Sequence, residues 1–263
     1  MNNILVAIAS FIGLGITFSF FEKRFCLHRQ NINRFQWQLD TVYYFTGYFI
    51  NKFGIWICVA LAVLLKSQFN SDTSISVLSQ QPFLIQLIIV LILSELGYYF
   101  AHRLLHQIPF LWQFHAIHHS AEKIDWLTTT RVHPFDQLFT KFFQLTPLLY
   151  LDFSSEVMAV YFLWSSAIAF FIHANLRIKL PILRRIITTP ETHHWHHSRN
   201  PHSYNTNFAA QLACVDWLFG TYYCPQKKPD INYGIAEKLP NTYLKQLLYP
   251  FRRTEKKLRC LHD

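Results

Sequence analysis

The sequence is poor in cysteine and in charge, and each shortage excludes a class of protein. The five cysteines are dispersed and form no C-x-x-C pair, which excludes a zinc ribbon and gives no disulfide framework. Charged residues make up only 15% of the 263 residues and hydrophobic residues 51%, which is too apolar for an average soluble domain. No flavin, nicotinamide or cysteine-rich cluster motif is present, so any redox chemistry needs electrons from outside the chain.

Four long apolar blocks predict a membrane protein. About 20 apolar residues span the bilayer core, and three of the blocks are each long enough: residues 4–21, 41–65 and 83–101. The first block has the length of a signal peptide, but it has no basic start and no clear small-residue cleavage site. We therefore interpret it as a retained membrane helix.

The fourth block, residues 138–172, is interrupted by Asp152 and Glu156. We interpret it as two shorter segments, 138–151 and 155–173, that form a hairpin dipping into the membrane. The predicted fold class is therefore all-α, an integral-membrane helical bundle with about four membrane-embedded segments.

The placement of the basic residues predicts the topology. A net charge of +9 is typical of nucleic-acid-binding proteins, but lysine and arginine gather after the first apolar block and near the C-terminus. Under the positive-inside rule the 22–40 loop and the C-terminal half are cytoplasmic, and the 67–82 connection lies on the far side. We expect no nucleic-acid partner. The basic tail either contacts anionic lipid headgroups or is simply solvated.

The histidines of the sequence are clustered. Nine of its fourteen histidines fall in three clusters, and residues three and four apart on a helix share a face. Eight of the nine repeat this spacing, so their imidazoles should converge: His102 and His106; His115, His118 and His119; His193, His196 and His197. His194 falls outside the repeat, and we assign it either a structural role or a role behind the metal ligands.

Eight imidazoles are too many for one metal. A tetrahedral site takes only four ligands, so the count predicts two metal ions. Neutral imidazole is the commonest protein ligand for metals near neutral pH. All three clusters follow the third apolar block, so they can meet on one membrane face, in a cytoplasmic helical cap that holds a histidine-ligated dimetal site.

Glu95 is a carboxylate inside an apolar block, which is costly and makes it a functional candidate. It precedes His102 by seven residues, or two helical turns, so both lie on one face. We expect it to accept the free ring N–H of a metal-bound histidine. The alternative is a protonated or snorkelling carboxyl group without a role.

The order H-x3-H, H-x2-H-H, H-x2-H-H after apolar blocks resembles the fatty acid hydroxylase / sterol desaturase superfamily of integral-membrane di-iron enzymes. The resemblance covers about residues 90–223 and extends beyond the ligands to five segments: Leu93–Arg103, Trp112–Ser120, Arg131–Pro134, Phe171–Asn175 and Asp216–Tyr222. The position of Glu95 is more often Asp in that family, which weakens the role assigned to this residue.

The resemblance implies the activity and completes the site. It adds His173 as a ninth metal ligand and implies two iron ions, with zinc possible in the purified protein. The reaction implied is O2-dependent hydroxylation or desaturation of a C–H bond in a membrane lipid of fatty acyl, sterol or isoprenoid type. A ferredoxin, a b-type cytochrome or another reductase on the cytoplasmic side would supply the electrons.

Together with the apolar blocks, the resemblance divides the chain into three parts. Residues 1–82 form N-terminal transmembrane helices and their connecting loops, and residues 83–225 form a catalytic domain of the fatty acid hydroxylase type. Residues 226–263 form a basic cytoplasmic tail.

Two other functions stay open as alternatives. A zinc hydrolase would normally carry H-E-x-x-H with a glutamate base, and the segment His102–His106 has no glutamate. A histidine-rich membrane metal transporter would place its ligands near the bilayer midplane between broken spans, whereas these clusters lie outside the apolar blocks.

Overall fold

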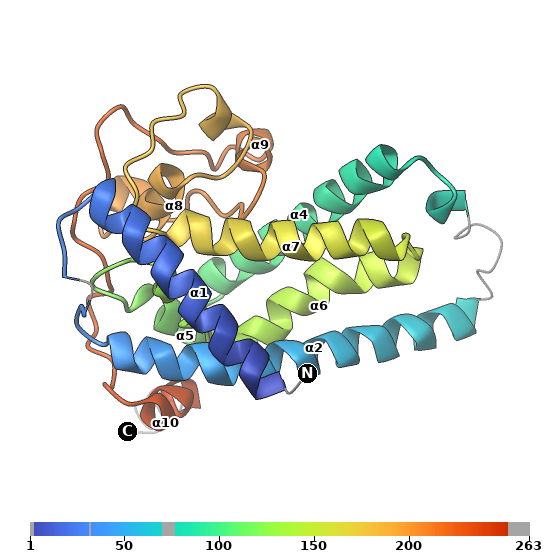
Figure 1. Ribbon diagram of the computed structural model, residues 1–263, viewed down its shortest axis with the longest axis horizontal. Coiled ribbons are helices and arrows are strands. Elements are labelled where there is room, and N and C mark those ends of the chain that lie inside the picture. Colours follow the sequence, from blue (N-terminus) through green and yellow to red (C-terminus); the bar gives the residue numbers. More distant parts are fainter. Residues whose placement is uncertain (1–2, 32, 70–76, 252–263) are drawn as a thin grey trace, which may run out of the picture.

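The structure is a computed structural model, and it describes residues 3–31, 33–69 and 77–251. Long helices run along its longest axis and short helices gather in a cap at one end (Figure 1). The long helices are α1 (Asn3–Arg24), α2 (Trp37–Phe69), α4 (Phe83–Gln107), α6 (Pro134–Leu151) and α7 (Ser155–His173). The all-α prediction is confirmed.

Four of the described helices are long and apolar enough to cross a membrane, namely α1, α2, α4 and α7. They expose large apolar side chains such as Trp56, Leu84 and Leu163, as expected of helices that face lipid. About four membrane-embedded segments were predicted, and the structure agrees. The expected hairpin corresponds to α6 and α7, but α7 by itself has the length and hydropathy of a full span.

Helix α6 is the centre of the bundle, because it packs against both α2 and α4. At the crossing with α4, a Cβ on Gly97 would lie 2.2 Å from the carbonyl oxygen of Phe143, so only glycine permits this approach. Asp152 then adopts a left-handed conformation, with φ of 60°, and turns the chain from α6 into α7.

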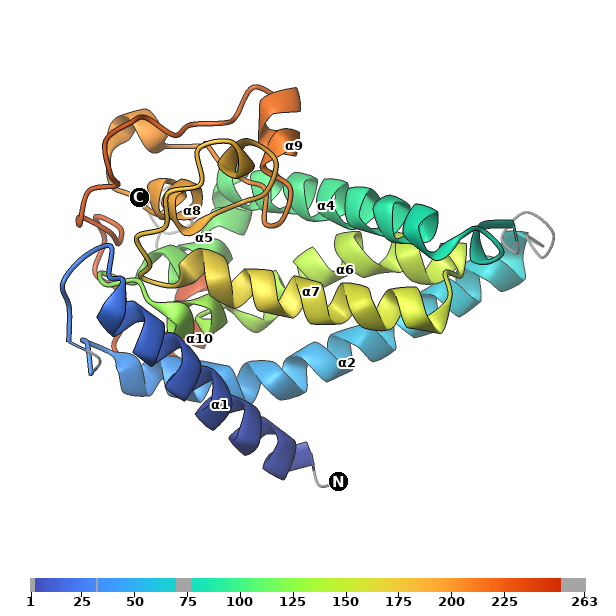
Figure 2. The ribbon, with the colours of Figure 1, turned by 45° about the horizontal axis from the view of Figure 1, so that its top comes forward.

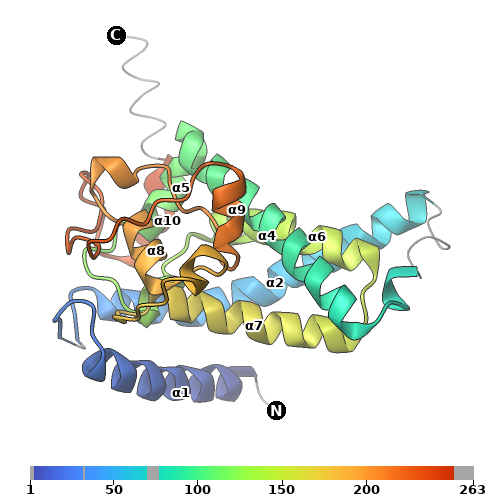
Figure 3. The same ribbon diagram turned by 90° about the horizontal axis from the view of Figure 1, so that it is seen from above.

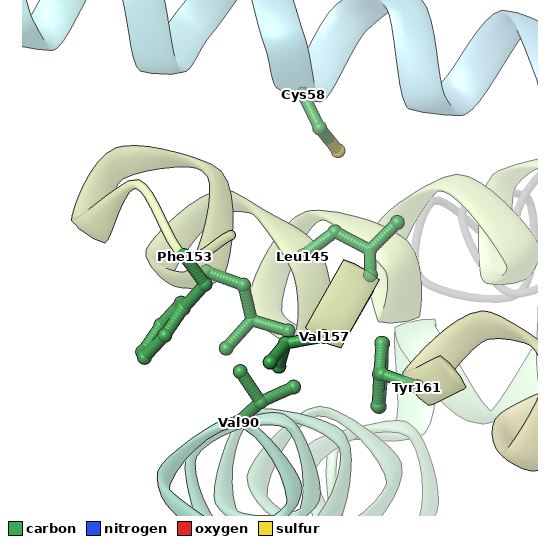
Figure 4. Close-up of a cluster of buried hydrophobic side chains, with 7 residues drawn as sticks. Cys58, Val90, Leu145, Phe153, Val157 and Tyr161 are labelled. Carbon is green, nitrogen blue, oxygen red and sulfur yellow. The ribbon is translucent and has the colours of Figure 1, made fainter. Parts of the chain in front are cut away.

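A buried apolar cluster joins α2, α4, α6 and α7 on the side of the bundle away from the cap. Cys58 from α2, Val90 from α4, Leu145 from α6 and Val157 and Tyr161 from α7 point toward one another (Figure 4). Because interiors of this kind are close-packed, the cluster fixes how the helices cross and therefore where their other ends lie.

Those other ends meet at the cap. Helices α4 and α7 end there, and α2 and α6 begin there (Figures 1 and 2). Helix α1 also ends there, and it lies on the outside of the bundle (Figure 3). Every predicted histidine ligand is therefore at one end of the bundle.

The cap consists of short helices whose starts are encoded locally. Pro109 and Pro190 occupy the first turns of α5 and α8, where proline's missing N–H costs no hydrogen bond. The side chains of Thr189 and Thr192 form a capping box at the start of α8. The cap elements are α5 (Pro109–His119), η1 (Trp126–Thr130), η2 (Leu183–Arg185), α8 (Pro190–His196), η3 (Pro201–Ser203), α9 (Ala213–Leu218) and α10 (Tyr243–Leu247).

The C-terminal region up to residue 251 is not a detached tail. Tyr233 is buried, and the Tyr43 hydroxyl of α2 donates to the Gln246 side-chain carbonyl of α10 at 2.9 Å. The polar composition of residues 226–251 did not indicate these contacts in the sequence. The last basic residues of the expected tail, from Arg252 onward, lie outside the described residues.

Candidate metal centre

The nine predicted ligands come together, in two groups. His102, His106, His115, His119 and His196 form a five-histidine group, and His118, His173, His193 and His197 form a four-histidine group. Within each group the ring nitrogens lie within 4.8 Å of one another. Eight of the nine side chains are buried and His106 is half-buried.

The structure divides the sequence clusters between the groups. His115 and His119 stay together, as do His193 and His197, but His118 and His196 each join the other group. We had expected each cluster to converge as a whole. Successive helical residues are rotated by about 100°, so His118 and His119 cannot point at the same metal. The i, i+4 pairs remain together, and the i+3 member turns away.

Most of the rings are anchored through Nδ1. His102 donates to the Phe208 carbonyl at 2.7 Å, His118 to the Arg131 carbonyl at 3.2 Å, and His115 to the Asp136 carboxylate at 2.8 Å. His173 donates to the Ala169 carbonyl at 2.9 Å, and His196 to the Thr206 carbonyl at 2.7 Å. A neutral imidazole has one N–H and one lone pair, so these contacts leave the lone pair on Nε2.

The Nε2 lone pairs then face one another. In the five-histidine group, the Nε2 atoms of His102 and His115 are 3.0 Å apart, and in the four-histidine group those of His118 and His173 are 3.1 Å apart. Because all four rings already donate from Nδ1, neither pair has a proton to share. Two lone pairs at this distance repel unless a cation accepts both. Each group contains one such pair, which fits one metal ion in each.

An orphaned nitrogen supports the same conclusion. Nε2 of His106 is buried without a hydrogen-bond partner. Buried polar atoms are normally satisfied, and a ligating nitrogen is satisfied by its metal. The donor set is all imidazole, which suits iron as well as zinc and copper, so the residues present fit a pair of iron ions.

Burial keeps the rings outside the spans neutral. Burial, and then the neighbouring imidazoles, lower the pKa of His118, His119, His193 and His197 well below the usual 6.5. Burial likewise lowers the pKa of His196 to about 3. Neutral imidazole is the ligating form, so the site is prepared for metal near neutral pH.

Among the residues that the structure describes, Glu95 contacts no imidazole directly. Its two carboxylate oxygens accept the backbone N–H groups of Ala210 and Gln211, at 2.7 and 2.8 Å. Asp216 accepts those of Phe208 and Ala209, at 2.8 and 3.1 Å. The two carboxylates thus hold the loop whose Phe208 carbonyl orients His102. The direct contact with a histidine that we expected is replaced by this indirect one.

Sequence reasoning missed Asp136, the carboxylate that does accept an imidazole N–H. It lies in the first turn of α6, directly after the helix start at His133 and Pro134, and is 2% exposed. Acidic residues are common near helix N-termini, where they interact favourably with the helix dipole, so Asp136 did not stand out in the sequence. Its closeness to the histidine motifs in the chain was the only available signal.

A buried ionic network supports His118 from behind. The side chain of Arg131, whose carbonyl accepts from His118, is fully buried and pairs with Asp40 of α2. Asp40 also pairs with Arg34, and Arg34 pairs with Asp125 at 2.6 Å. The network joins α2 to the segment that carries Arg131. Removing one partner of such a pair typically costs about 3–5 kcal/mol, because the other charge stays buried.

His194 lies outside both groups, as its spacing predicted. It is fully buried, and its Nε2 donates to the His173 carbonyl at 3.2 Å. Its Nδ1 then accepts from the Tyr233 hydroxyl at 2.9 Å. His194 therefore connects the ligand-bearing end of α7 to the C-terminal region.

Comparison with known proteins gives sequence relatives but no structural one. The family model described as fatty acid hydroxylase matches residues 87–221, which contain all nine histidines. Ornithine lipid hydroxylase OlsE from Rhizobium tropici is 36% identical over 182 residues, covering 68% of this chain and 54% of that protein. Alkylglycerol monooxygenases from Xenopus tropicalis and Homo sapiens are 33% and 32% identical over 149 residues, covering 57% of this chain and 32% of each protein. The chain thus spans about half or less of these relatives' lengths, and no solved structure matches it.

Proposed function

The chain belongs to the fatty acid hydroxylase family, and from this premise we propose that it hydroxylates a C–H bond of a membrane lipid, using O2 and two iron ions. The observation that carries the proposal is that two Nε2 atoms without a proton face each other in each histidine group. The membrane spans and the names of the relatives support a lipid as substrate, since those names refer to an ornithine lipid and an alkylglycerol.

Each histidine group would hold one iron. When bound, the iron pair supplies the activation of O2 and the removal of hydrogen from an unactivated carbon. The residues of the chain do the rest. Asp136 and the carbonyls behind the rings hold five of the imidazoles in the tautomer that presents Nε2, and Glu95 and Asp216 keep one of those carbonyls in place.

Aromatic side chains pack against several of the rings. Phe208 packs against His102 and His106, with ring centroids 5.7 and 5.2 Å apart. Trp112 packs against His106 and His119, at 5.1 and 5.4 Å. These apolar contacts limit the access of water on their side of the rings, which suits oxidation of a lipid carbon.

We place the histidine end of the bundle in the cytoplasm, where an external donor such as a ferredoxin, a b-type cytochrome or another reductase would dock. Lys23 and Arg24 end α1 at this same end, in line with the positive-inside rule. Reporter fusions after residue 30, between α2 and α4, and at the C-terminus test the topology. A far-side signal from the C-terminus would overturn it.

The test of the activity uses the full chain in lipid vesicles, loaded with ferrous iron and supplied with a chemical reductant and isotopically labelled O2. We expect one labelled oxygen atom in each modified lipid, detected by mass spectrometry. His118→Ala protein serves as the control and should give no labelled lipid. Iron-loaded, reduced protein that consumes O2 without labelling any lipid would refute the proposal.

A further inference from the structure

A cavity of about 510 Å³ reaches the metal centre. His106, His119 and His196 of the five-histidine group and His197 of the four-histidine group line it, together with Trp112. Imidazole and indole rings thus form part of its lining. A molecule in this cavity would lie against histidines of both groups.

The rest of the lining is mixed: Pro109, Ile235 and Ala236 are apolar, and the polar residues include Arg199, Tyr204, Asn205 and Glu237. These four come from the loop after α8 and from the C-terminal region. A hydrocarbon chain against them would remove them from water without offering hydrogen bonds in return, which is costly. The polar residues of the lining therefore suit the polar part of a lipid better than its tail.

Arg199 is the cation of this lining, and its backbone is held on both sides. Its N–H donates to the Asn232 carbonyl at 2.9 Å, and its own carbonyl accepts from the Tyr204 hydroxyl at 3.0 Å. Its side chain has no ion-pair partner among the residues that the structure describes. Glu237 in the same lining differs, because it already accepts from the Tyr249 hydroxyl at 2.9 Å.

An unpaired guanidinium beside a cavity is suited to an anion. Its planar fork binds phosphate or carboxylate through two parallel hydrogen bonds, which gives both strength and orientation. A compact cavity of this volume is roughly 10 Å across, so such an anion would lie within that distance of the histidines.

We infer that Arg199 binds an anionic group, phosphate or carboxylate, in the headgroup of the lipid substrate. The carbon that is oxidised then lies close to the headgroup, not at the far end of an acyl chain. This inference rests on the proposed lipid hydroxylase function and names the part of the lipid that the site receives.

Binding can be measured without O2 or reductant, so the test does not depend on turnover. Full-length protein in detergent is titrated with three lipids and followed by native mass spectrometry. Phosphatidic acid carries a phosphate, an N-acylglycine carries a carboxylate, and diacylglycerol carries no anion. We expect at least one of the anionic lipids to bind about tenfold or more tightly than diacylglycerol. The anionic lipid that binds more tightly identifies the headgroup.

The matched variants are Arg199→Gln, Arg199→Lys and Arg185→Gln. Arg185 is an exposed arginine of the cap that does not line the cavity. We expect Arg199→Gln to abolish the preference for the anion, Arg199→Lys to restore part of it, and Arg185→Gln to leave it unchanged.

Three outcomes would overturn the inference: equal binding of all three lipids, an anion preference that survives in Arg199→Gln, or an equal loss in Arg185→Gln. A weakened response to the electron donor with unchanged lipid binding would also overturn it, because Arg199 would then serve protein docking. Failure of lipid labelling in the activity assay, with anion binding intact, would refute the proposed function separately.

Discussion

Replacing Asp136 by Asn should weaken the binding of one metal ion and leave the binding of the other unchanged. Asp136 accepts the Nδ1 proton of His115 at 2.8 Å, and the two residues are 2% and 3% exposed, respectively. His115 belongs to the five-histidine group, and no ring of the four-histidine group contacts Asp136 among the described residues. Asn keeps the volume and an acceptor oxygen but removes the negative charge.

The magnitude follows from the loss of a charge-assisted hydrogen bond. A carboxylate behind a ligating imidazole raises the basicity of its Nε2, and removal of such a partner typically lowers metal affinity about 10- to 100-fold. That factor corresponds to about 1.4–2.8 kcal/mol for the metal in the five-histidine group. The ring should keep its orientation, because the Asn side-chain carbonyl still accepts from Nδ1.

The assay is a chelator competition on iron-loaded protein, with the iron that remains per chain measured at each chelator concentration. Wild type should release its two ions at similar concentrations, and Asp136→Asn should release one of them about 10- to 100-fold earlier. Asp230→Asn, at an exposed position of the cap, is the control and should match wild type. If Asp136→Asn released both ions together, or neither earlier, the division into two groups would be refuted.

Three further predictions concern the neighbouring residues and pH. His193→Ala should lose the metal of the four-histidine group. His194→Ala should keep both metals and only lower the thermal midpoint, because His194 forms hydrogen bonds with Tyr233 and a backbone carbonyl. Equal metal loss in the two variants would contradict this. Glu95→Gln replaces one acceptor oxygen by an NH2 group, which would face a backbone N–H. The rate of lipid oxidation should therefore fall about 10- to 100-fold, while the metal of the four-histidine group stays bound. Unchanged activity would show that the 208–211 loop does not need the carboxylate. In the metal-free protein, burial lowers the pKa values of four ring systems: His118, His119, His193 and His197. Below about pH 6.5 the unfolded chain therefore binds more protons than the folded chain, and the stability of the fold should decrease as the pH falls through that value. A thermal midpoint that is constant or rises from about pH 7 to 5 would contradict this.

Local spacing predicted which histidines come together, because helical geometry determines which side chains share a face. The eight histidines identified by spacing all reach the two groups, and His194 does not. Spacing could not divide the ligands, however. The partition depends on how α5 and α8 are placed against the ends of α4 and α7, which is a tertiary property.

Residues that act on the site from a distance were harder to predict. His173 has no partner at helical spacing, and only the resemblance to a known family assigned it. Its ring reaches His193 and His118, at 2.9 and 3.1 Å between Nε2 atoms, because α7 ends beside α8 and α5. Glu95 was correctly singled out as an unusual carboxylate. Its partners are backbone groups more than 100 residues away in the chain, which no local pattern indicates.

The membrane spans were easier to predict, because they follow from composition. Long apolar runs predict spans wherever they exceed the bilayer thickness. The hairpin was harder to interpret, since α6 carries Asp136 and Lys141 in its first half, while α7 is apolar between Glu156 and His173 apart from two serines. Burial of α6 between α2 and α4 explains why a helix at the centre of a membrane bundle can be the least apolar of the long helices.

The central claim is that nine histidines of one chain bind two metal ions. The most direct test is the metal content of full-length protein reconstituted with ferrous iron, measured by elemental analysis against protein concentration from amino-acid analysis. The two histidine groups predict about two metal ions per chain, counting iron and any residual zinc together. One ion or none per chain, in protein that still oxidises lipid, would contradict the account.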